Sequence, residues 1–340
     1  MGSVKDLKIM EKPTEQEPGR GRFSFSDRYS VFDWGEMPDL IDNKGPAIAL
    51  LGAYFFEKLE EMGIPTHYIG LVEKGSVKKL SELESPSDTM EVDILRVIKP
   101  RLEAGNYDYS MYGEEKGGFL IPLELIYRNY LPPGSSVFKR LEKGEITPQD
   151  LGLAEKPHPD QKLETPVLDV STKLEVTDRY ISWQEAREIS GLSEAELAEL
   201  KQITSTINDF ITREFSKIGL VNEDGKIETG FDFQRRLMLV DVLGTLDECR
   251  FTFEGLPVSK EVLRIYYRDT AWHQATEEAK KEDRQNWKNI CRLSPEPLPP
   301  RLKHLVSQIY SSCTNEITGK EWFQGVMPLE KIMEEIKEWV

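Results

Sequence analysis

The chain has few cysteines, no long apolar run and no excess of positive charge. Its 340 residues include only three cysteines, Cys249, Cys291 and Cys313. They stand far apart and match neither a disulfide framework nor a zinc site. No apolar stretch approaches the roughly 20 residues that a membrane-spanning helix needs, and no signal peptide is visible. We therefore expect a cytoplasmic protein that has no membrane partner.

Negative charge dominates the sequence. The chain carries 60 acidic residues against 44 lysines and arginines, which gives a net charge of −16 at pH 7. This balance argues against nucleic acid as the main partner, and an anionic substrate would need cations gathered at its own site. The length suffices for one large domain or for two lobes with a sizeable core. We find no internal repeat and no extended low-complexity segment.

The most informative stretch runs from Phe119 to Arg140. In residues 120–129, apolar residues are interrupted at alternate positions, which is typical of a half-buried strand. Glu124 and Arg128 fall on the same face because side chains repeat every two residues, so Glu124 could orient the guanidinium toward an anion. A Pro-Pro-Gly turn, two serines and two cations follow, a combination that could also hold an anion. The alternative is an edge strand with a solvated polar face.

Hydrophobic spacing predicts several further elements. Apolar residues at helical spacing predict a core helix over about 43–63, and a capping box at Ser193 opens a second long helix. The segment 91–102 is typical of a strand. The polar, tyrosine-containing segment 105–118 predicts a long loop, either functional or simply on the surface. By itself, Asp224-Gly225 indicates a hairpin turn.

Several motifs resemble, in the same order, those of the phosphoribosylaminoimidazole-succinocarboxamide synthase (SAICAR synthetase) family. The central motif is Pro122-x-Glu124-x-x-x-Arg128-Asn129, followed by a short turn and Gly134-Ser135. The others are Asp27-Arg28-Tyr29-Ser30-Val31-Phe32-Asp33, Thr165-Pro166 to Ser171-Thr172-Lys173-x-Glu175, Asp224-Gly225-Lys226-Ile227-Glu228, Leu239-Val240-Asp241, and Asp247 to Arg250. The resemblance runs from about Asp27 to Phe323, and its blocks are specific only when they are taken together.

The resemblance implies a fold and a reaction. The fold would be α+β, with two lobes of antiparallel sheets and flanking helices around an ATP cleft. Residues 1–118 would form an N-terminal lobe with a nucleotide-phosphate hairpin and a substrate loop, and residues 119–340 a C-terminal lobe with the remaining sites. The reaction would be ATP-dependent ligation of L-aspartate to carboxyaminoimidazole ribonucleotide in purine biosynthesis, through an acyl phosphate. The partners would be small molecules, and a homo-oligomer is compatible with the sequence.

The resemblance also implies roles for individual residues. Lys226 and Asp247 would be catalytic. ATP would be bound by Lys12, Glu124, Lys226, Glu228 and Asp241. Mg²⁺ would be bound by the carboxylates of Glu228 and Asp241, facing one cleft from two adjacent strands. The ribotide and L-aspartate would be bound by Ser30, Asp33, Arg128, Ser135, Lys173, Asp178 and Arg250.

The first hairpin departs from the family pattern. Its strands would end near Lys12 and cover residues 22–25. Relatives usually carry a glycine followed by a lysine there, often with a second lysine or an arginine two residues on, and the lysines meet ATP phosphates. Here Glu11 replaces the glycine, and Lys12 stands for one lysine. The second cation is missing unless Arg20 or Arg22 supplies it.

Other departures lie after Asp241. Val242 stands where many relatives carry an acid, Leu246 replaces a proline and Cys249 replaces a serine. Arg268 stands where we expect the family's lysine–acid or lysine–glutamine pair, which an arginine follows. These changes leave two alternatives open. One is a paralogous ATP-dependent ligase or phosphotransferase with another substrate, and the other is a non-catalytic nucleotide-binding protein.

Overall fold

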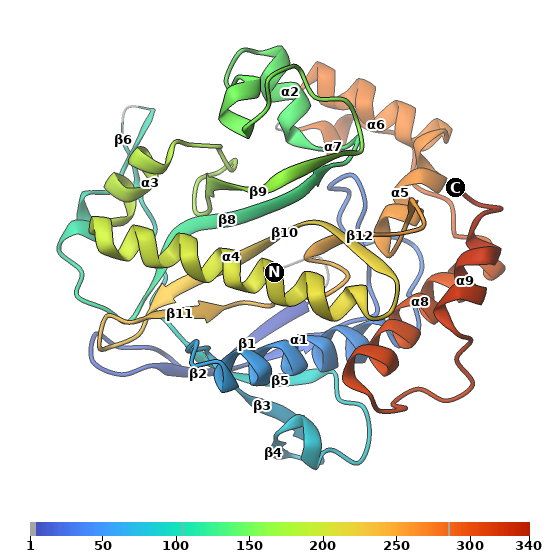
Figure 1. Cartoon of the computed structure of the whole chain (residues 1–340), viewed down its shortest axis with the longest axis horizontal. Coiled ribbons are helices and arrows are strands. Elements are labelled where there is room, and N and C mark those ends of the chain that lie inside the picture. The colour runs from blue at the N-terminus through green and yellow to red at the C-terminus, as the bar shows by residue number, and fades with distance from the viewer. Residues whose placement is uncertain (1–4, 104, 285) are drawn as a thin grey trace.

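The computed structural model describes residues 5–103, 105–284 and 286–340 (Figure 1). In this part of the chain the strands form two larger sheets and one two-stranded sheet, and all strand pairs within them are antiparallel. Helices pack against both larger sheets. The fold is therefore α+β, as the family resemblance predicted.

The first sheet has the strand order β1-β2-β5-β3-β4. Its strands are β1 (Lys5–Glu11), β2 (Gly19–Phe25), β3 (Tyr68–Glu73), β4 (Ser76–Lys78) and β5 (Thr89–Ile94). Alternate residues of β2, among them Phe23 and Phe25, are buried, so one face of this sheet meets the core. Helix α1 (Lys44–Glu61) packs on that sheet, where it contacts β2, β3 and β5.

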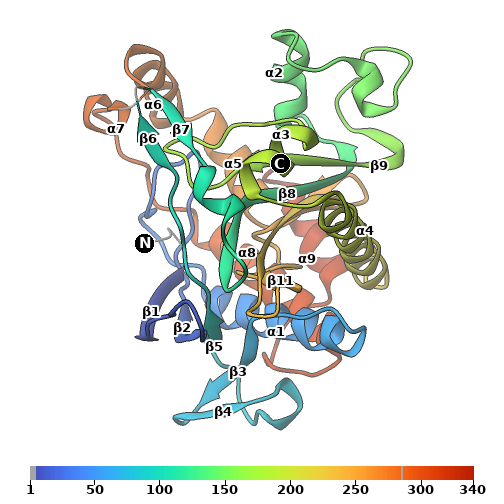
Figure 2. The same cartoon turned by 90° about the vertical axis from the view of Figure 1, so that its left-hand side faces the viewer.

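The second sheet has the order β13-β12-β10-β8-β9, and β11 pairs with the far end of β10. Its strands are β8 (Phe119–Leu131), β9 (Gln161–Thr172), β10 (Leu220–Phe231), β11 (Leu237–Val240), β12 (Cys249–Phe253) and β13 (Leu256–Pro257). The predicted strand over 120–129 is confirmed as β8. It lies between β10 and β9, so the edge-strand alternative is wrong. Figure 2 shows β8 and β9 in the upper half of the molecule and β3 and β4 at its lower end.

Helices surround the two sheets (Figure 1). Besides α1, the α-helices of the described residues are α2 (Ser136–Glu142), α3 (Trp183–Ser190), α4 (Glu194–Ser216), α5 (Lys260–Arg268), α6 (Ala271–Glu282), α7 (Trp287–Ile290), α8 (Pro300–Thr318) and α9 (Leu329–Ile336). The predicted capping box is confirmed, because Ser193 and Glu196 bond reciprocally at the start of α4. Helix α4 lies across β8, β9 and β10, and α8 packs against α1 and α9. None of these helices is both long and apolar enough to cross a lipid bilayer.

The two larger sheets meet at the segment 65–67. The N–H of His67 donates to the Leu239 carbonyl at 2.9 Å, and the N–H of Leu239 donates to the Pro65 carbonyl at 2.8 Å. The buried His67 ring also places Nε2 2.9 Å from the carbonyl oxygen of Asp241. The connection that leads into β3 of the first sheet is therefore fixed directly beside β11.

Two local predictions are wrong. The strand expected over 91–102 ends at Ile94, and strand structure resumes only at Arg101 in β6 (Arg101–Glu103), which pairs with β7 (Asn106–Asp108). Between them Arg96 exchanges backbone hydrogen bonds with the Gly118–Leu120 segment, which leads the chain out of the first sheet. Asp224-Gly225 forms no turn but lies inside β10, paired with β8 and β12.

Candidate active site

A cavity of about 750 Å³ lies along β8 and β10 and is bordered by the loop after β11 and by α5 and α6. Several residues that the resemblance implicated line it together: Asp33, Glu124, Arg128, Asp178, Lys226, Asp247 and Arg250. Antiparallel pairing explains the grouping, because Arg128 is opposite Asp224 and Glu124 is opposite Glu228. Glu124 and Arg128 share one face of β8, as predicted. We call this space the main cavity.

A cluster of guanidinium groups forms one part of the main cavity. Arg128 is only 2% exposed and contacts Asp169 at 3.4 Å and Asp224 at 3.5 Å. Its nitrogens also donate to Ser135 Oγ at 3.3 Å, Ser136 Oγ at 3.2 Å and Tyr180 Oη at 3.1 Å. The predicted orientation of Arg128 by Glu124 is therefore wrong, because the two aspartates take that position.

A second arginine joins this cluster through Asp224. Arg250 forms a two-pronged ion pair with Asp224, with Nε 2.8 Å from Oδ1. Ser135 caps the short helix α2 and is itself buried, and Lys139 of that helix lines the cavity. These groups place several positive charges around one polar hollow in a chain of strongly negative net charge. Such a hollow suits a phosphate or carboxylate of a substrate.

Ammonium and carboxylate groups alternate along another part of the site. Lys226 Nζ lies 3.4 Å from Glu124, 3.5 Å from Glu228 and 3.2 Å from Glu248. Burial alone would lower the pKa of Lys226, but the carboxylates around it, Glu248 first, raise it above its ordinary value. Lys173 contacts Glu124 at 3.5 Å and donates to Glu228. Both lysines are therefore held in the charged form.

Lys5 completes this group from the first sheet. Its ammonium forms an ion pair with the carboxylate of Asp241, the residue that follows β11. Burial would raise the pKa of Asp241, but Lys5, the largest opposing influence, helps hold it below its ordinary value. Burial, and next the charge of Asp241, raises the pKa of Glu228. The charge of Asp241 thus acts on Glu228, whose partner on the adjacent strand, Val240, precedes Asp241.

Asp247 is anchored on the side facing the helices. Its Oδ2 lies 2.7 Å from Lys44 Nζ of α1, and its Oδ1 accepts a hydrogen bond of 2.6 Å from Tyr310 of α8. Lys260, at the start of α5, donates to the Asp247 carbonyl at 2.6 Å. Burial opposes ionisation here, but the ion pair with Lys44, with a further contribution from Lys260, lowers the pKa of Asp247 to about 2. Both carboxylate oxygens therefore already have protein partners.

Three residues of the early segments lie apart from these clusters. Lys12 is exposed just after the end of β1. Ser30 Oγ accepts a hydrogen bond from the Gly35 N–H at 3.3 Å. The Asp33 side chain is 93% exposed at the rim of the main cavity, and its backbone has a positive φ of 61°. The structure thus brings Asp33 to the cavity but leaves Lys12 away from it.

Several residues of the site were not identified in the sequence. Lys5 begins β1, a mostly exposed strand that carried no motif. Lys260-Glu261, with Arg264 after it, also line the main cavity. They match the expected lysine–acid pair followed by an arginine better than Arg268 does, so the spacing of charges could have identified them. The acidic partners of Arg128, Asp169 and Asp224, become apparent only from strand register.

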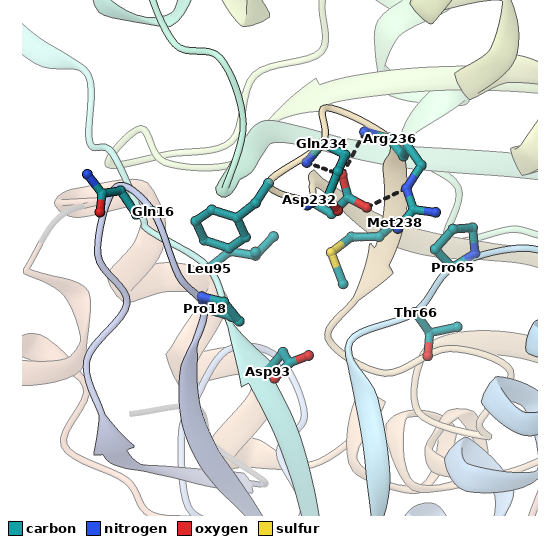
Figure 3. A pocket seen from close by; sticks show the side chains of 11 residues that line it. Gln16, Pro18, Pro65, Thr66, Asp93, Leu95, Asp232, Gln234, Arg236 and Met238 are labelled. Carbon is teal, nitrogen blue, oxygen red and sulfur yellow. Dashed lines mark hydrogen bonds and ion pairs between the residues drawn. The ribbon is translucent and has the colours of Figure 1, made fainter.

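A smaller cavity of about 340 Å³ opens where the sheets meet (Figure 3). Pro18, Thr66, Asp93 and Leu95 line it from the first sheet and its connections, and Met238 lines it from β11. The turn between β10 and β11 closes the rim, where Asp232 accepts hydrogen bonds from the Gln234 N–H and from Arg236, as Figure 3 shows. We call this space the junction cavity. Thr66, which lines it, precedes His67, and the His67 ring contacts the Asp241 carbonyl.

Comparison with known proteins gives a consistent picture. The SAICAR synthetase family matches residues 12–279. An Archaeoglobus fulgidus protein, provisionally named phosphoribosylaminoimidazole-succinocarboxamide synthase, is 51% identical over 338 residues, which is 99% of both chains. The phosphoribosylaminoimidazole-succinocarboxamide synthase of Thermoplasma acidophilum is 32% identical over 311 residues, covering 88% of this chain and 93% of the relative.

Solved structures agree at the level of the fold. The SAICAR synthase of Saccharomyces cerevisiae, solved with SAICAR, is 21% identical with a TM-score of 0.63, covering 95% of this chain and 94% of that one. A SAICAR synthetase in complex with ADP is 22% identical with a TM-score of 0.56, covering 87% and 99%. Family, relatives and fold coincide over most of the sequence, and the chain belongs to the SAICAR synthetase family.

Proposed function

We propose that this protein joins L-aspartate to carboxyaminoimidazole ribonucleotide at the expense of ATP, giving SAICAR, ADP and phosphate. Family membership supports this activity. The structural observation that carries it is the main cavity, where the buried guanidinium cluster lies beside the alternating lysines and carboxylates. A phosphorylated, carboxylated substrate needs the first group, and phosphoryl transfer needs the second.

The chemistry requires activation of a carboxylate, because a carboxylate is a poor electrophile. The ribotide carboxylate oxygen attacks the γ-phosphorus of ATP, ADP leaves, and an acyl phosphate forms. The amine of L-aspartate then attacks the acyl carbon, phosphate leaves with the C–O bond electrons, and the amine loses a proton. The protein contributes mostly by positioning and by stabilising charge. We assign Lys226 to the phosphoryl group in transfer, because its ammonium is charged and lines the cavity.

The guanidinium cluster is the proposed site of the ribotide's phosphate. Arg250, half-buried, and Lys139 border the space beside Ser136 and Arg128. Arg128 already contacts Asp169 and Asp224, so it acts by fixing this wall as well as by its charge. Lys173 and Asp178 are the proposed contacts of the remaining charged groups of the ribotide or of L-aspartate.

ATP is proposed to lie between the sheets, with its base in the junction cavity. Leu95 and Met238 offer apolar contact there, and Asp93 offers a hydrogen-bond acceptor. The phosphates would extend past His67 toward Lys5 and Lys226. In this arrangement Lys5 takes the role that the sequence had suggested for Lys12.

The side chains present could hold Mg²⁺ only if the phosphates of a bound nucleotide supply further ligands. In the described parts of the chain, no cluster of three or more His, Cys, Asp or Glu side chains could hold a metal ion. Glu228 is paired with Val240, the residue before Asp241, on the adjacent strand, and Mg²⁺ is commonly bound by one or two carboxylates plus substrate phosphates. We propose that Glu228 and Asp241 hold the ion, which when bound would neutralise phosphate charge.

The test is an assay with the purified full chain, ATP, Mg²⁺, the ribotide and L-aspartate. We expect SAICAR, ADP and phosphate in equal amounts, and no ADP when the ribotide is omitted. ATP turnover with a different acceptor would instead support a paralogous ligase or phosphotransferase. Nucleotide binding without turnover of any acceptor would support a non-catalytic protein.

A further inference from the structure

Residues 106–113, which lie outside the recognised motifs, contact a loop that borders the proposed reaction site. Residues 173–179 follow β9 and form this loop. From here on the name substrate loop refers to these residues, and not to the loop expected within residues 1–118. At its start, Lys173 contacts Glu124 and Glu228. Near its end, Asp178 lines the main cavity. Both residues are proposed to contact substrates, so the position of this loop matters for binding.

The two ends of the substrate loop are fixed by hydrogen bonds to its own base and to β8. The N–H of Thr172 donates to the Arg179 carbonyl at 2.9 Å, and the N–H of Arg179 donates to Thr172 Oγ1 at 3.1 Å. The N–H of Lys173 donates to the Pro122 carbonyl at 3.1 Å. The middle of the loop lies outside the sheet and needs other support.

Two tyrosines of the segment 106–113 supply that support. The N–H of Val176 donates to Tyr107 Oη at 2.8 Å, and Tyr109 Oη donates to Glu175 Oε1 at 2.8 Å. The Glu175 side chain is only 4% exposed, whereas Val176 beside it is 85% exposed. The loop tip therefore projects into solvent and is held from one side by these hydroxyl groups, together with the half-exposed Arg179 that also reaches Glu175.

The tyrosines are themselves attached to the core. Their rings follow one another, with centroids 6.5 Å apart for Tyr107 and Tyr109 and 6.0 Å apart for Tyr109 and Tyr112. The fully buried Tyr112 in turn packs on Phe119, the first residue of β8, at 5.8 Å. Burial, and next the bond to Glu175, raises the pKa of Tyr109. The hydroxyl therefore remains a donor throughout the working pH range.

We propose that Tyr107 and Tyr109 are positioning residues, which hold the substrate loop in place so that Asp178 meets an N–H group of the incoming substrate. The group could belong to the amine of L-aspartate or to the amino group of the ribotide, since the carboxylate would accept from either. This inference rests on the proposed function. A loop that is already ordered loses less conformational entropy on binding, so losing a tyrosine hydroxyl weakens substrate binding rather than the chemical step.

Steady-state kinetics of Tyr109→Phe, Asp178→Asn and the double variant test the proposal. The substrate whose KM rises in Asp178→Asn is the one that Asp178 contacts. We expect Tyr109→Phe to raise the same KM about 3- to 10-fold, as a lost hydrogen bond of about 0.7–1.4 kcal/mol would. The kcat should stay within about twofold and the KM of ATP should not change. The double variant should resemble Asp178→Asn. The proposal fails if Asp178→Asn leaves every KM unchanged. It also fails if Tyr109→Phe leaves every KM unchanged, or raises the KM of a substrate other than the one affected by Asp178→Asn.

Hydrogen exchange gives a readout that does not depend on activity. In the full chain without substrates, Tyr107→Phe keeps the ring but removes the acceptor of the Val176 N–H. We expect faster exchange in residues 174–178 and an unchanged rate in β8. The matched control is Tyr54→Phe, which removes a comparable 2.9 Å tyrosine–glutamate bond, to Glu214, elsewhere in the fold.

The control should alter neither the loop exchange nor any KM. Lower melting temperatures of Tyr107→Phe and Tyr109→Phe with unchanged exchange and unchanged KM values would show a purely structural role and overturn the inference. If the unmodified protein forms no SAICAR, the proposed function fails, while the exchange experiment still reports whether the tyrosines hold the loop.

Discussion

Arg128 is held by two buried aspartates and three hydroxyl groups, so its guanidinium is fixed before any substrate arrives. A planar, forked donor can satisfy Asp169, Asp224 and the serines at once, and an ammonium group cannot. The residue thus links β8, β9 and β10 at one point of the cavity wall. Its replacement should affect both the site and the stability of the fold.

We expect Arg128→Lys to lower kcat/KM for the ribotide about 10- to 100-fold, because charge-assisted hydrogen bonds are worth about 1.5–3 kcal/mol. The melting temperature should also fall, while the Kd of ATP stays within about threefold. Steady-state kinetics, thermal melting and calorimetric titration would measure these. Arg213→Lys, an exposed arginine of α4, is the control. Ribotide kinetics equal to wild type would exclude Arg128 from the substrate site.

Lys5 and Lys12 give a matched pair for the nucleotide assignment. Lys5→Ala removes the ammonium beside Asp241 and should lower kcat/KM for ATP about tenfold or more, since a charged contact of about 1.5–3 kcal/mol is lost. Lys12→Ala should remain within about twofold of wild type, because Lys12 is exposed away from the cavities. Initial rates measured at varied ATP concentrations would distinguish between the two lysines. A larger loss of kcat/KM in Lys12→Ala than in Lys5→Ala would indicate that Lys12, and not Lys5, contacts the ATP phosphates.

Arg128 and Lys5 show which parts of the site the sequence could predict and which it could not. Arg128, Glu124 and Ser135 stand in a dense local motif, so their grouping was foreseeable. Lys5 reaches its partner across the junction of two sheets, 236 residues along the chain. Strand register and sheet packing determine the contact between Lys5 and Asp241, and no local sequence pattern predicts it.

Among the elements, β10 supplies side chains to both charged parts of the main cavity. It places Asp224, Lys226 and Glu228 on one face by the two-residue repeat of a strand. The sequence correctly predicted α1, α4 and β8, because their apolar periods are long and regular. It mistook Asp224-Gly225 for a turn signal, since a glycine inside a strand is locally indistinguishable from one in a hairpin.

The role of that glycine can be tested. A Cβ added at Gly225 would lie 2.8 Å from Cys249 Sγ and closer still to the Tyr127 hydroxyl, both buried. We expect Gly225→Ala to lower the free energy of unfolding by about 1–3 kcal/mol, as overpacking does, and to reduce activity. Urea unfolding would measure it. Gly113→Ala, where an added methyl meets nothing within 4 Å, should be nearly neutral. Equal stabilities for the two variants would contradict this packing.

At the level of the whole molecule, Asp247 connects the cavity wall to two distant helices. Lys44 of α1 and Tyr310 of α8 approach its carboxylate from segments more than 250 residues apart in sequence. Sequence reasoning found Asp247 through its motif but not these partners, because tertiary packing alone brings α1 and α8 together. The prediction that the chain divides into lobes at residues 118 and 119 stays a prediction.

The Asp247 contacts predict an acid-dependent stability. The pKa of Asp247 is lowered in the folded protein to about 2, below the value of about 3.9 for an unfolded chain. Its stabilising effect is therefore complete above about pH 4 and is lost as the pH falls through about 2. At pH 7 Asp247→Asn should cost about 3–5 kcal/mol, because Lys44 is left buried without a counter-charge.

Urea unfolding from pH 6 to pH 2.5 would follow this effect. The stability difference between wild type and Asp247→Asn should shrink as the pH falls below about 4. Asp209→Asn, an exposed residue of α4, should show no such convergence. A difference that stays constant down to pH 2.5 would mean that the carboxylate is not ionised through the Lys44 contact.

The pairing of Lys5 with Asp241 has a consequence for the order in which the protein matures. During synthesis the first strand emerges from the ribosome long before the residue that its lysine must meet. Contacts of such large sequence separation form late, since the intervening chain must first be ordered. A refolding chain should therefore regain its helical circular dichroism before it regains nucleotide affinity. Until β11 is in place, an incomplete chain lacks the proposed nucleotide-phosphate site, so we expect it to consume no ATP.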